Sequence, residues 1–245
     1  MSDETRRGFL MGTAGFALQA GAVSIAAWPA GQTKTAAKSP KSGTHEPEME
    51  VSPAEDLMRE HGVLNRVLLI YDEAIRRLRS AQDLDVSIVA GSARLIRTFI
   101  EDYHEKLEED YLFPRFEKAH RLTDLVAVLR AQHQAGRRVT EQIRQLAVPA
   151  GLKDTSARNQ LADVVAQFVR MYRPHEARED TVLFPALRSI VSANEYDSLG
   201  EEFEEKEHKL FGEDGFEKTV DEVAGFEKKL GIYDLSRFTP VEARP

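Results

Sequence analysis

Two copies of a His-x-x-x-Glu pattern carry side chains that can bind a metal ion. His104 and Glu108 form the first copy, and His175 and Glu179 form the second. In a helix, side chains four residues apart lie on one face, so each pair can hold an ion between an imidazole nitrogen and a carboxylate oxygen. A single pair of this kind is more often an exposed surface pair, so the interpretation depends on the rest of the chain.

Two further histidines occupy positions that suit the core of a helix. His61 is flanked by Leu57 and Leu64, and His133 follows Leu129 at helical spacing. A buried imidazole loses its hydration and needs a polar partner, and for one histidine alone a hydrogen bond in the core is a sufficient explanation. Four histidines and two spaced glutamates on a shared face indicate a metal site instead, because burying two carboxylates without cations is strongly unfavourable.

An internal repeat connects the two patterns. Residues 104–114 align without gaps on residues 175–185, with six of eleven positions identical and Leu-Phe-Pro at the end of both segments. His61 and His133 are 72 residues apart, close to the offset of 71 between His104 and His175. The chain therefore repeats a helical hairpin, and two such hairpins joined antiparallel make a four-helix bundle with an approximate twofold axis.

Apolar residues at helical spacing predict where the helices lie. They cover approximately residues 53–78, 86–112, 123–146 and 155–191, with Pro114 interrupting or kinking the second helix and Pro174 kinking the fourth. No segment shows the period-two alternation of a half-buried strand. The predicted fold class is all-α, with an up-down-up-down four-helix bundle over residues 53–192.

An acidic helical extension is predicted over residues 193–245. It contains one helix that ends near Leu210 and another over approximately residues 216–230. His208 follows Glu204 by four residues, but in so charged a helix a solvated pair is the favoured interpretation. Contacts with the bundle are expected from apolar side chains of the extension: Phe203, Leu210, Phe211 and Phe216.

The composition limits the chemistry of any site. The chain has 245 residues and no cysteine, so thiolate metal sites, iron–sulfur clusters on cysteine and disulfides are excluded. A metal must be held by imidazole and carboxylate. The formal net charge is −8, concentrated between residues 195 and 230, and this balance argues against a nucleic-acid partner because phosphate binding needs a basic surface.

The first residues are typical of an export signal. Arg6 and Arg7 precede an uncharged, Ala-rich and Gly-rich stretch over residues 12–27, and the consecutive arginines resemble a twin-arginine signal. The stretch is short for a bilayer helix, so no permanent membrane span is expected. We predict a signal peptide over residues 1–30, a flexible polar linker over 31–52 that includes a solvated His45, and a periplasmic or cell-envelope location.

The order of the histidines and glutamates resembles the hemerythrin-like HHE cation-binding family. The resemblance covers approximately residues 53–192, including the Leu-Phe-Pro after both glutamates. It implies a bundle around two non-haem iron ions joined by an oxo or hydroxo bridge. It also implies that His61, His104, His133 and His175 are terminal ligands and that Glu108 and Glu179 bridge the metals. Zinc or manganese would also suit such nitrogen and oxygen ligands.

The sequence departs from that of the oxygen-carrying hemerythrins. Arg137 stands where they have a further histidine, four residues after the histidine of the third helix. They use His-x-x-x-x-Asp in the last helix, a spacing that Asp180 matches, although Glu179 is the repeat partner of Glu108. Glu105 and Glu176 follow ligand histidines and are interpreted either as supporting groups or as solvent-facing carboxylates.

Three hypotheses for the function follow. The favoured one is a diiron protein that meets dioxygen, peroxide or nitric oxide, with a peroxide-consuming or oxygen-consuming oxidoreductase active in oxidative stress as its enzymatic form. The alternative is an iron-binding or sensing module without turnover. A helical bundle that holds zinc for structural reasons is the least favoured. The sequence leaves the oligomeric state open.

Replacing Arg6 and Arg7 together with Lys is expected to retain the folded protein in the cytoplasm. The substitution keeps the charge of the segment, so it tests the arginine pair and not the charge. Cell fractionation with an antibody against the bundle measures the outcome. Unchanged recovery of the variant outside the cytoplasm would contradict the twin-arginine interpretation.

Overall fold

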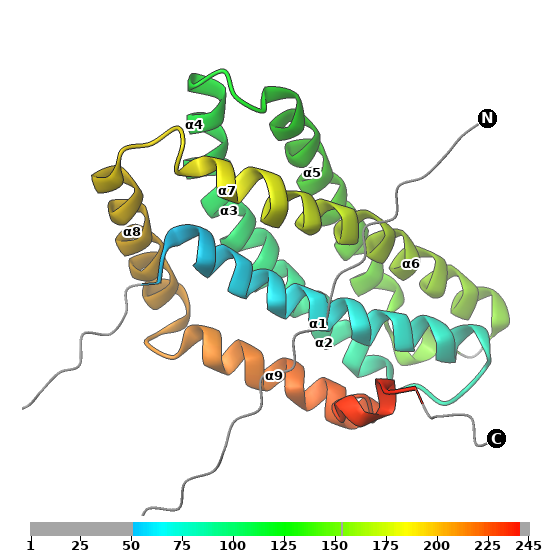
Figure 1. The fold of residues 1–245 in the computed structure, drawn as a ribbon. Helices are drawn as coiled ribbons and strands as arrows, with labels where there is room; N and C mark the ends of the chain where they lie inside the picture. Colours follow the sequence, from blue (N-terminus) through cyan, green and yellow to red (C-terminus); the bar gives the residue numbers. More distant parts are fainter. Residues whose placement is uncertain (1–50, 153, 241–245) are drawn as a thin grey trace, which may run out of the picture. The chain divides into compact units, whose positions relative to one another are not determined.

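The computed structural model describes residues 51–152 and 154–240 (Figure 1). Within these ranges the chain is helical and contains no strand, which confirms the predicted all-α class. No helix in this part of the chain combines the length and apolar character needed to cross a bilayer. The predicted signal peptide, and the predicted linker except Val51 and Ser52, lie outside the described residues.

Four helical rods form the bundle. The first and third are α1 (Pro53–Arg79) and α5 (Thr123–Leu146). The second contains α2 (Val86–Leu95), a π-helical segment Ile96–His104, α3 (Glu105–Leu107), a π-helical segment Glu108–Leu112 and α4 (Phe113–Lys118). The fourth contains α6 (Thr155–Arg178), a π-helical segment Glu179–Leu183 and α7 (Phe184–Leu187).

Two further helices, α8 (Ala193–Phe211) and α9 (Gly215–Leu230), follow the bundle. Short 3₁₀ turns lie at Pro149–Leu152 and Leu235–Phe238. In Figure 1, α9 runs beside α1, and α8 lies across the end of the bundle where α1 begins.

Side chains outside the helices fix where several of them begin. Ser52, Asp85, Asp154 and Ser192 each accept a hydrogen bond from a backbone N–H in the first turn of α1, α2, α6 and α8, respectively. Such caps satisfy N–H groups that have no helical partner and typically stabilise a helix by about 1 kcal/mol.

Pro114 does not end the second rod, whose end the sequence predicts near residue 112 with an interruption or a kink at this proline. The second rod continues to Lys118, and the fourth ends at Leu187, earlier than expected. In both rods a phenylalanine donates its backbone N–H to the carbonyl oxygen of the ligand-type glutamate five residues earlier: Phe113 to Glu108, and Phe184 to Glu179. This wide π turn comes just before a proline. The missing proline N–H therefore falls near the start of a new helical turn, where it costs little.

The bundle core is apolar and aromatic. α1 packs along α6, α6 along α5, and α5 against α2. The largest fully buried side chains include Tyr71, whose ring meets the edge of Phe168 at a centroid distance of 5.5 Å. Phe168 in turn stacks on Tyr172 at 4.3 Å. Aromatic packing continues to the histidines, because the Tyr172 ring meets that of His175 at 5.4 Å.

The extension docks through apolar and ionic contacts. Arg66 of α1 donates two hydrogen bonds to the Glu227 carboxylate of α9, at 3.0 and 2.5 Å. The absence of a side chain at Gly91 lets the Phe226 ring approach α2, because a Cβ there would lie 2.6 Å from the ring.

Not every predicted apolar contact of the extension is made. Phe203 is fully buried, Phe211 lies against Phe99 and Tyr103, and Phe216 lies against Phe99. Leu210 is 58% exposed, so its predicted docking role is wrong. It lines an open pocket between α8 and the second rod, together with Tyr103, Leu107 and Tyr111.

Gly136 and Gly62 form a matched test of close packing. A Cβ at Gly136 would lie 2.0 Å from the buried hydroxyl of Tyr172, whereas Gly62 has no atom within 4 Å of that position. We expect Gly136→Ala to lower the free energy of unfolding by about 1–3 kcal/mol through overpacking. We expect Gly62→Ala to raise it by about 0.5–1 kcal/mol through helix propensity. Urea unfolding of both variants tests this, and equal stability would contradict the packing of α5 on α6.

Candidate metal centre

The structure brings the six predicted ligand side chains to one buried place in the bundle. They come from all four rods and from residues as far apart as 61 and 179, and none has a relative exposure above 3%: His61, His104, Glu108, His133, His175 and Glu179. Their positions follow from the repeat, because each hairpin contributes one lone histidine and one His-x-x-x-Glu pair.

The histidines form two pairs. The Nε2 atoms of His61 and His104 lie 3.0 Å apart, with ring centroids 4.6 Å apart. His133 and His175 have ring centroids 5.0 Å apart. In each pair, the lone histidine of a hairpin lies beside the histidine of the His-x-x-x-Glu pattern in the same hairpin. Each hairpin therefore presents two imidazoles to the core.

The two glutamates lie between these pairs. An oxygen of Glu108 lies 3.3 Å from His133 Nε2 and 3.9 Å from His104 Nε2. An oxygen of Glu179 lies 3.1 Å from His175 Nε2 and 3.5 Å from His61 Nε2. Each carboxylate therefore reaches both histidine pairs, which is the arrangement that a carboxylate needs to bridge two ions.

The unsatisfied atoms of the site fit metal ions. Both carboxylate oxygens of Glu108 and of Glu179, and the Nε2 atom of His133, are buried and make no hydrogen bond to any described residue. Leaving such groups without partners is costly. His133, His175 and Glu179 place one ligand atom each within 4.8 Å of one another, which suits a single ion. Imidazole and carboxylate donors together suit iron, manganese or zinc.

A second layer of side chains fixes the direction of all four imidazoles. The Nδ1 atom of each histidine lies within hydrogen-bond distance of a side-chain oxygen, and this contact leaves Nε2 directed at the centre. The acceptors are Asp180 for His61 (2.7 Å), Glu60 for His104 (2.5 Å), Glu109 for His133 (3.1 Å) and Gln132 for His175 (2.9 Å).

This second layer follows the repeat of the sequence. Glu60 and Gln132 each precede the lone histidine of their hairpin, and Glu109 and Asp180 each follow the bridging-type glutamate. The symmetry is broken at one position, where a neutral amide in Gln132 replaces the carboxylate of Glu60. His104 therefore has a carboxyl group as its Nδ1 partner and its repeat partner His175 has an amide, so the two halves of the site differ.

The two central carboxyl groups titrate differently. Burial, reinforced by the carboxylates of Glu179 and Glu105, raises the pKa of Glu108 well above its ordinary value. Burial also acts on Glu179, but His175, His61 and His133 outweigh it and lower the pKa of that carboxyl. Without cations the pair therefore keeps a proton on Glu108, since two adjacent buried carboxylates cannot both ionise easily.

His104 is held neutral in the same environment. Burial, followed by the charges of the other three histidines, lowers the pKa of His104 well below its ordinary value. A neutral imidazole is the form that binds a metal.

Arg137 does not enter the site. Its guanidinium lies 2.8 Å from Glu105 and 2.8 Å from Glu109, and it donates a further hydrogen bond to the Glu101 carbonyl. Glu105 also accepts a hydrogen bond from the Tyr172 hydroxyl at 2.7 Å. Arg137 therefore forms ion pairs with two carboxylates near the ligand histidines, and its guanidinium lies outside the centre.

Glu105 and Glu176, which the sequence left as either supporting groups or solvent-facing carboxylates, are both buried. Glu105 and Glu176 are 1% and 4% exposed, so the solvent-facing alternative is wrong for both. Burial raises the pKa of Glu105 to about 8 and that of Glu176 to about 7. Both residues directly follow a ligand histidine, on rods that neighbouring helices cover on more than one face. The helical spacing of apolar residues in the sequence does not predict this additional burial.

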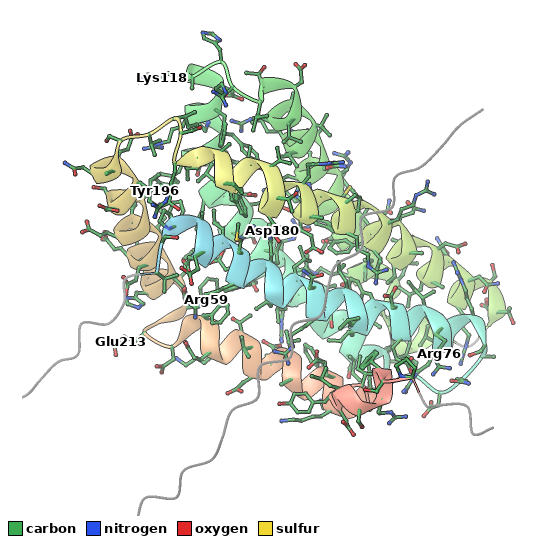
Figure 2. The ribbon with its side chains drawn as sticks, in the orientation of Figure 1. Arg59, Arg76, Lys118, Asp180, Tyr196 and Glu213 are labelled. Atoms are coloured by element: carbon green, nitrogen blue, oxygen red, sulfur yellow. The ribbon has the colours of Figure 1, made fainter. Side chains whose placement is uncertain are left out.

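Other histidines stay away from the centre. His120 and His208 are exposed, as predicted. His45 lies outside the described residues. Asp180, whose spacing matches a ligand of the oxygen carriers, instead accepts a hydrogen bond from His61, and Figure 2 shows it between the fourth rod and α1.

Sequence reasoning missed the acceptors Glu60, Glu109 and Gln132. A signal was present, because each of them adjoins a ligand-type residue and the repeat places them at matching positions. Tyr172 gave no such signal: its repeat position holds Glu101, and its contact with Glu105 arises only from the packing of two rods.

Comparisons with known proteins agree with this geometry. The model of the hemerythrin HHE cation binding domain matches residues 52–151, which contain three of the four candidate ligand histidines and Glu108. The chain is 54% identical over 197 residues to uncharacterized protein Rv1995 of Mycobacterium tuberculosis and to uncharacterized protein Mb2018 of Mycobacterium bovis, covering 80% of this chain and 77% of each relative. The chain belongs to the hemerythrin HHE family. No solved structure matches it.

Membership of the hemerythrin HHE family gives the site its general role, which is to bind metal cations. The matched region ends before His175 and Glu179. Those two residues belong to the second copy of the repeat, and the structure places them beside the matched histidines.

Metal binding to this hemerythrin HHE domain is expected to release protons and to tighten as the pH rises. The pKa of Glu108 is raised in the metal-free fold, so its proton must leave before the carboxylate can bind an ion. Calorimetric titration of metal-free protein with Mn²⁺, in buffers of different ionisation enthalpy, measures this release. A Glu108→Gln variant should release about one proton fewer. Binding that is independent of pH would contradict the assignment of Glu108.

Proposed function

We propose that the protein holds a pair of non-haem iron ions and that the reduced centre consumes peroxide or dioxygen. The protein is then a diiron oxidoreductase for a small oxidant and not a reversible oxygen carrier. The observation that carries the proposal is the position of Glu108 and Glu179, each within reach of both histidine pairs and each without a hydrogen bond from any described residue.

The ligand set supports two ions that share the glutamates. Four imidazole nitrogens and two bridging carboxylates leave coordination positions open on two six-coordinate metals. When bound, iron would supply one-electron steps between its ferrous and ferric states and a place for the oxidant. Helical bundles that place histidines and glutamates on facing rods are a known setting for such a pair.

The second layer supports a centre with fixed ligands. Asp180, Glu60, Glu109 and Gln132 hold the imidazoles so that little reorganisation accompanies a change of metal charge. Asp180 and Glu109 place negative charge on the Nδ1 side of His61 and His133, which makes these two histidines better donors. More basic ligands favour the ferric state, and this direction suits a protein that gives electrons to an oxidant.

Arg137 supports consumption over carriage. It stands where an oxygen carrier would supply a further histidine, and it pairs with Glu105 and Glu109 outside the centre. The position that this histidine would fill on a bound ion would therefore be open. An open position gives the oxidant access and provides less protection against further reaction.

Mixing the reduced, iron-loaded protein with dioxygen or with peroxide in a stopped-flow instrument tests the proposal. We expect the near-ultraviolet absorbance of the oxidised iron centre to rise and to persist under vacuum. Reversion to the reduced form under vacuum would establish a carrier. No reaction with either oxidant would leave an iron-binding module without turnover.

Matched glutamate variants serve as controls in the same experiment. Glu108→Ala and Glu179→Ala should weaken iron binding by more than about tenfold, since loss of a supporting group alone costs 10-fold or more. Glu117→Ala, a change on an exposed part of the second rod, should bind iron as the wild type does. Equal iron content in all three variants would contradict the site.

A further inference from the structure

A second group of oxygen ligands lies beside the centre, between α1 and α8. Asp56 and Glu60 are one helical turn apart on α1, and Glu207 comes from α8. One carboxylate oxygen of each lies within 4.8 Å of the others. Glu60 is fully buried, while Asp56 and Glu207 are half-buried, so the group extends from the protein surface to the interior.

Two buried polar atoms in this group have no hydrogen-bond partner among the described residues. The first is Oε1 of Glu60, whose other oxygen lies 2.5 Å from His104 Nδ1. The second is the hydroxyl of Tyr103, a residue that is 1% exposed. The Tyr103 hydroxyl lies next to the carboxyl group of Glu60. Unpartnered oxygens in so buried a place indicate a missing ligand.

The nearby basic group does not neutralise these carboxylates. Arg59 Nη1 lies 3.7 Å from Asp56, but the Arg59 side chain is 41% exposed and its guanidinium lies over the Phe216 ring at 4.4 Å. Figure 2 shows Arg59 on the side of α1 that faces α8 and α9, opposite the side on which Asp180 lies. Three carboxylates around one loosely paired arginine leave a net negative site made of oxygen ligands, which suits a hard divalent cation.

The turn between α8 and α9 positions the third carboxylate. Glu207 Oε1 accepts a hydrogen bond from the Phe216 N–H at 2.7 Å. A Cβ at Gly215 would lie 2.8 Å from the same oxygen, so the glycine allows this approach. Glu207 lies outside residues 52–151, the part that matches the family model, and the extension therefore adds this ligand to the bundle.

We propose that Asp56, Glu60 and Glu207 form a third cation site, which takes a hard divalent ion such as Fe²⁺ or Mn²⁺ and loads the dinuclear centre. Asp56 and Glu207 capture the ion at the surface. Glu60 receives it inside, one hydrogen bond away from His104. The proposal that an ion binds here depends only on these three side chains. The proposal that this ion then loads the dinuclear centre also depends on the function proposed above.

Terbium luminescence tests the binding step. The protein is first given two equivalents of Zn²⁺, which is colourless, and is then titrated with Tb³⁺, an ion that prefers oxygen ligands and emits when a nearby tyrosine is excited. We expect one saturable Tb³⁺ site per chain, with Tyr103 as the main sensitiser. Tyr103→Phe should therefore lower the emission per bound ion.

Charge-matched variants of α8 make this test specific. Glu207→Gln should weaken Tb³⁺ binding by about tenfold or more, since removing one charged ligand strongly lowers the affinity of such sites. Glu201→Gln removes the same charge from an exposed position of α8 and should leave the affinity unchanged. Asp56→Asn provides a second test if Glu207→Gln alters the fold, as judged by circular dichroism. No saturable binding, or equal loss in the Glu207 and Glu201 variants, would overturn the third site.

Cobalt uptake tests the loading step separately. Co²⁺ bound to histidine nitrogens absorbs visible light, so its arrival at the dinuclear centre can be followed in time. We expect Glu207→Gln to slow this arrival by about tenfold while the final content stays at two ions. Unchanged rates together with normal Tb³⁺ binding would overturn loading but retain the site. Absence of a cobalt signal in the wild type would instead contradict the dinuclear centre.

Discussion

Two buried glutamates that face histidines and receive no hydrogen bond from the described residues are the constraint on which the rest of the structure depends. Glu108 and Glu179 would destabilise a metal-free bundle, because a carboxylate in an apolar core must either keep a proton or meet a cation. The four rods nevertheless hold both side chains fully buried. The fold therefore concentrates an unfavourable electrostatic arrangement at one place, and metal binding turns it into a favourable one.

The repeat explains how the chain supplies this place. Each hairpin brings two imidazoles, one bridging-type carboxylate and two acceptors for Nδ1 atoms, and the acceptors act across hairpins for His61 and His133 but within a hairpin for His104 and His175. The wide π turns at Glu108–Leu112 and Glu179–Leu183 begin at the central glutamates themselves. Such turns are frequent at functional sites, and here they occur at both repeats of the same motif.

The extension turns a nearly symmetric bundle into an asymmetric protein. α8 and α9 cover only one side of α1, where they bring Glu207 to Asp56 and Glu60. Glu60 is also the acceptor for His104, whereas the equivalent position in the other hairpin is Gln132. One histidine pair thus borders Asp56, Glu60 and Glu207, and the other borders Glu105 and Glu109. A cation that approaches the centre meets two different halves.

The sequence by itself determined the helices, the repeat and the six residues of the candidate centre, because helical spacing and a gapless duplication are local properties of the chain. The tertiary structure decided what surrounds those residues. Whether Glu105 is buried, where Arg137 points and how Glu207 meets Glu60 depend on packing between rods that lie far apart in sequence. The continuation of the second rod past Pro114 depended on a π turn, which the spacing of apolar residues does not encode. Contacts between distant elements are set by three-dimensional packing, and a one-dimensional pattern records only the face on which each residue lies.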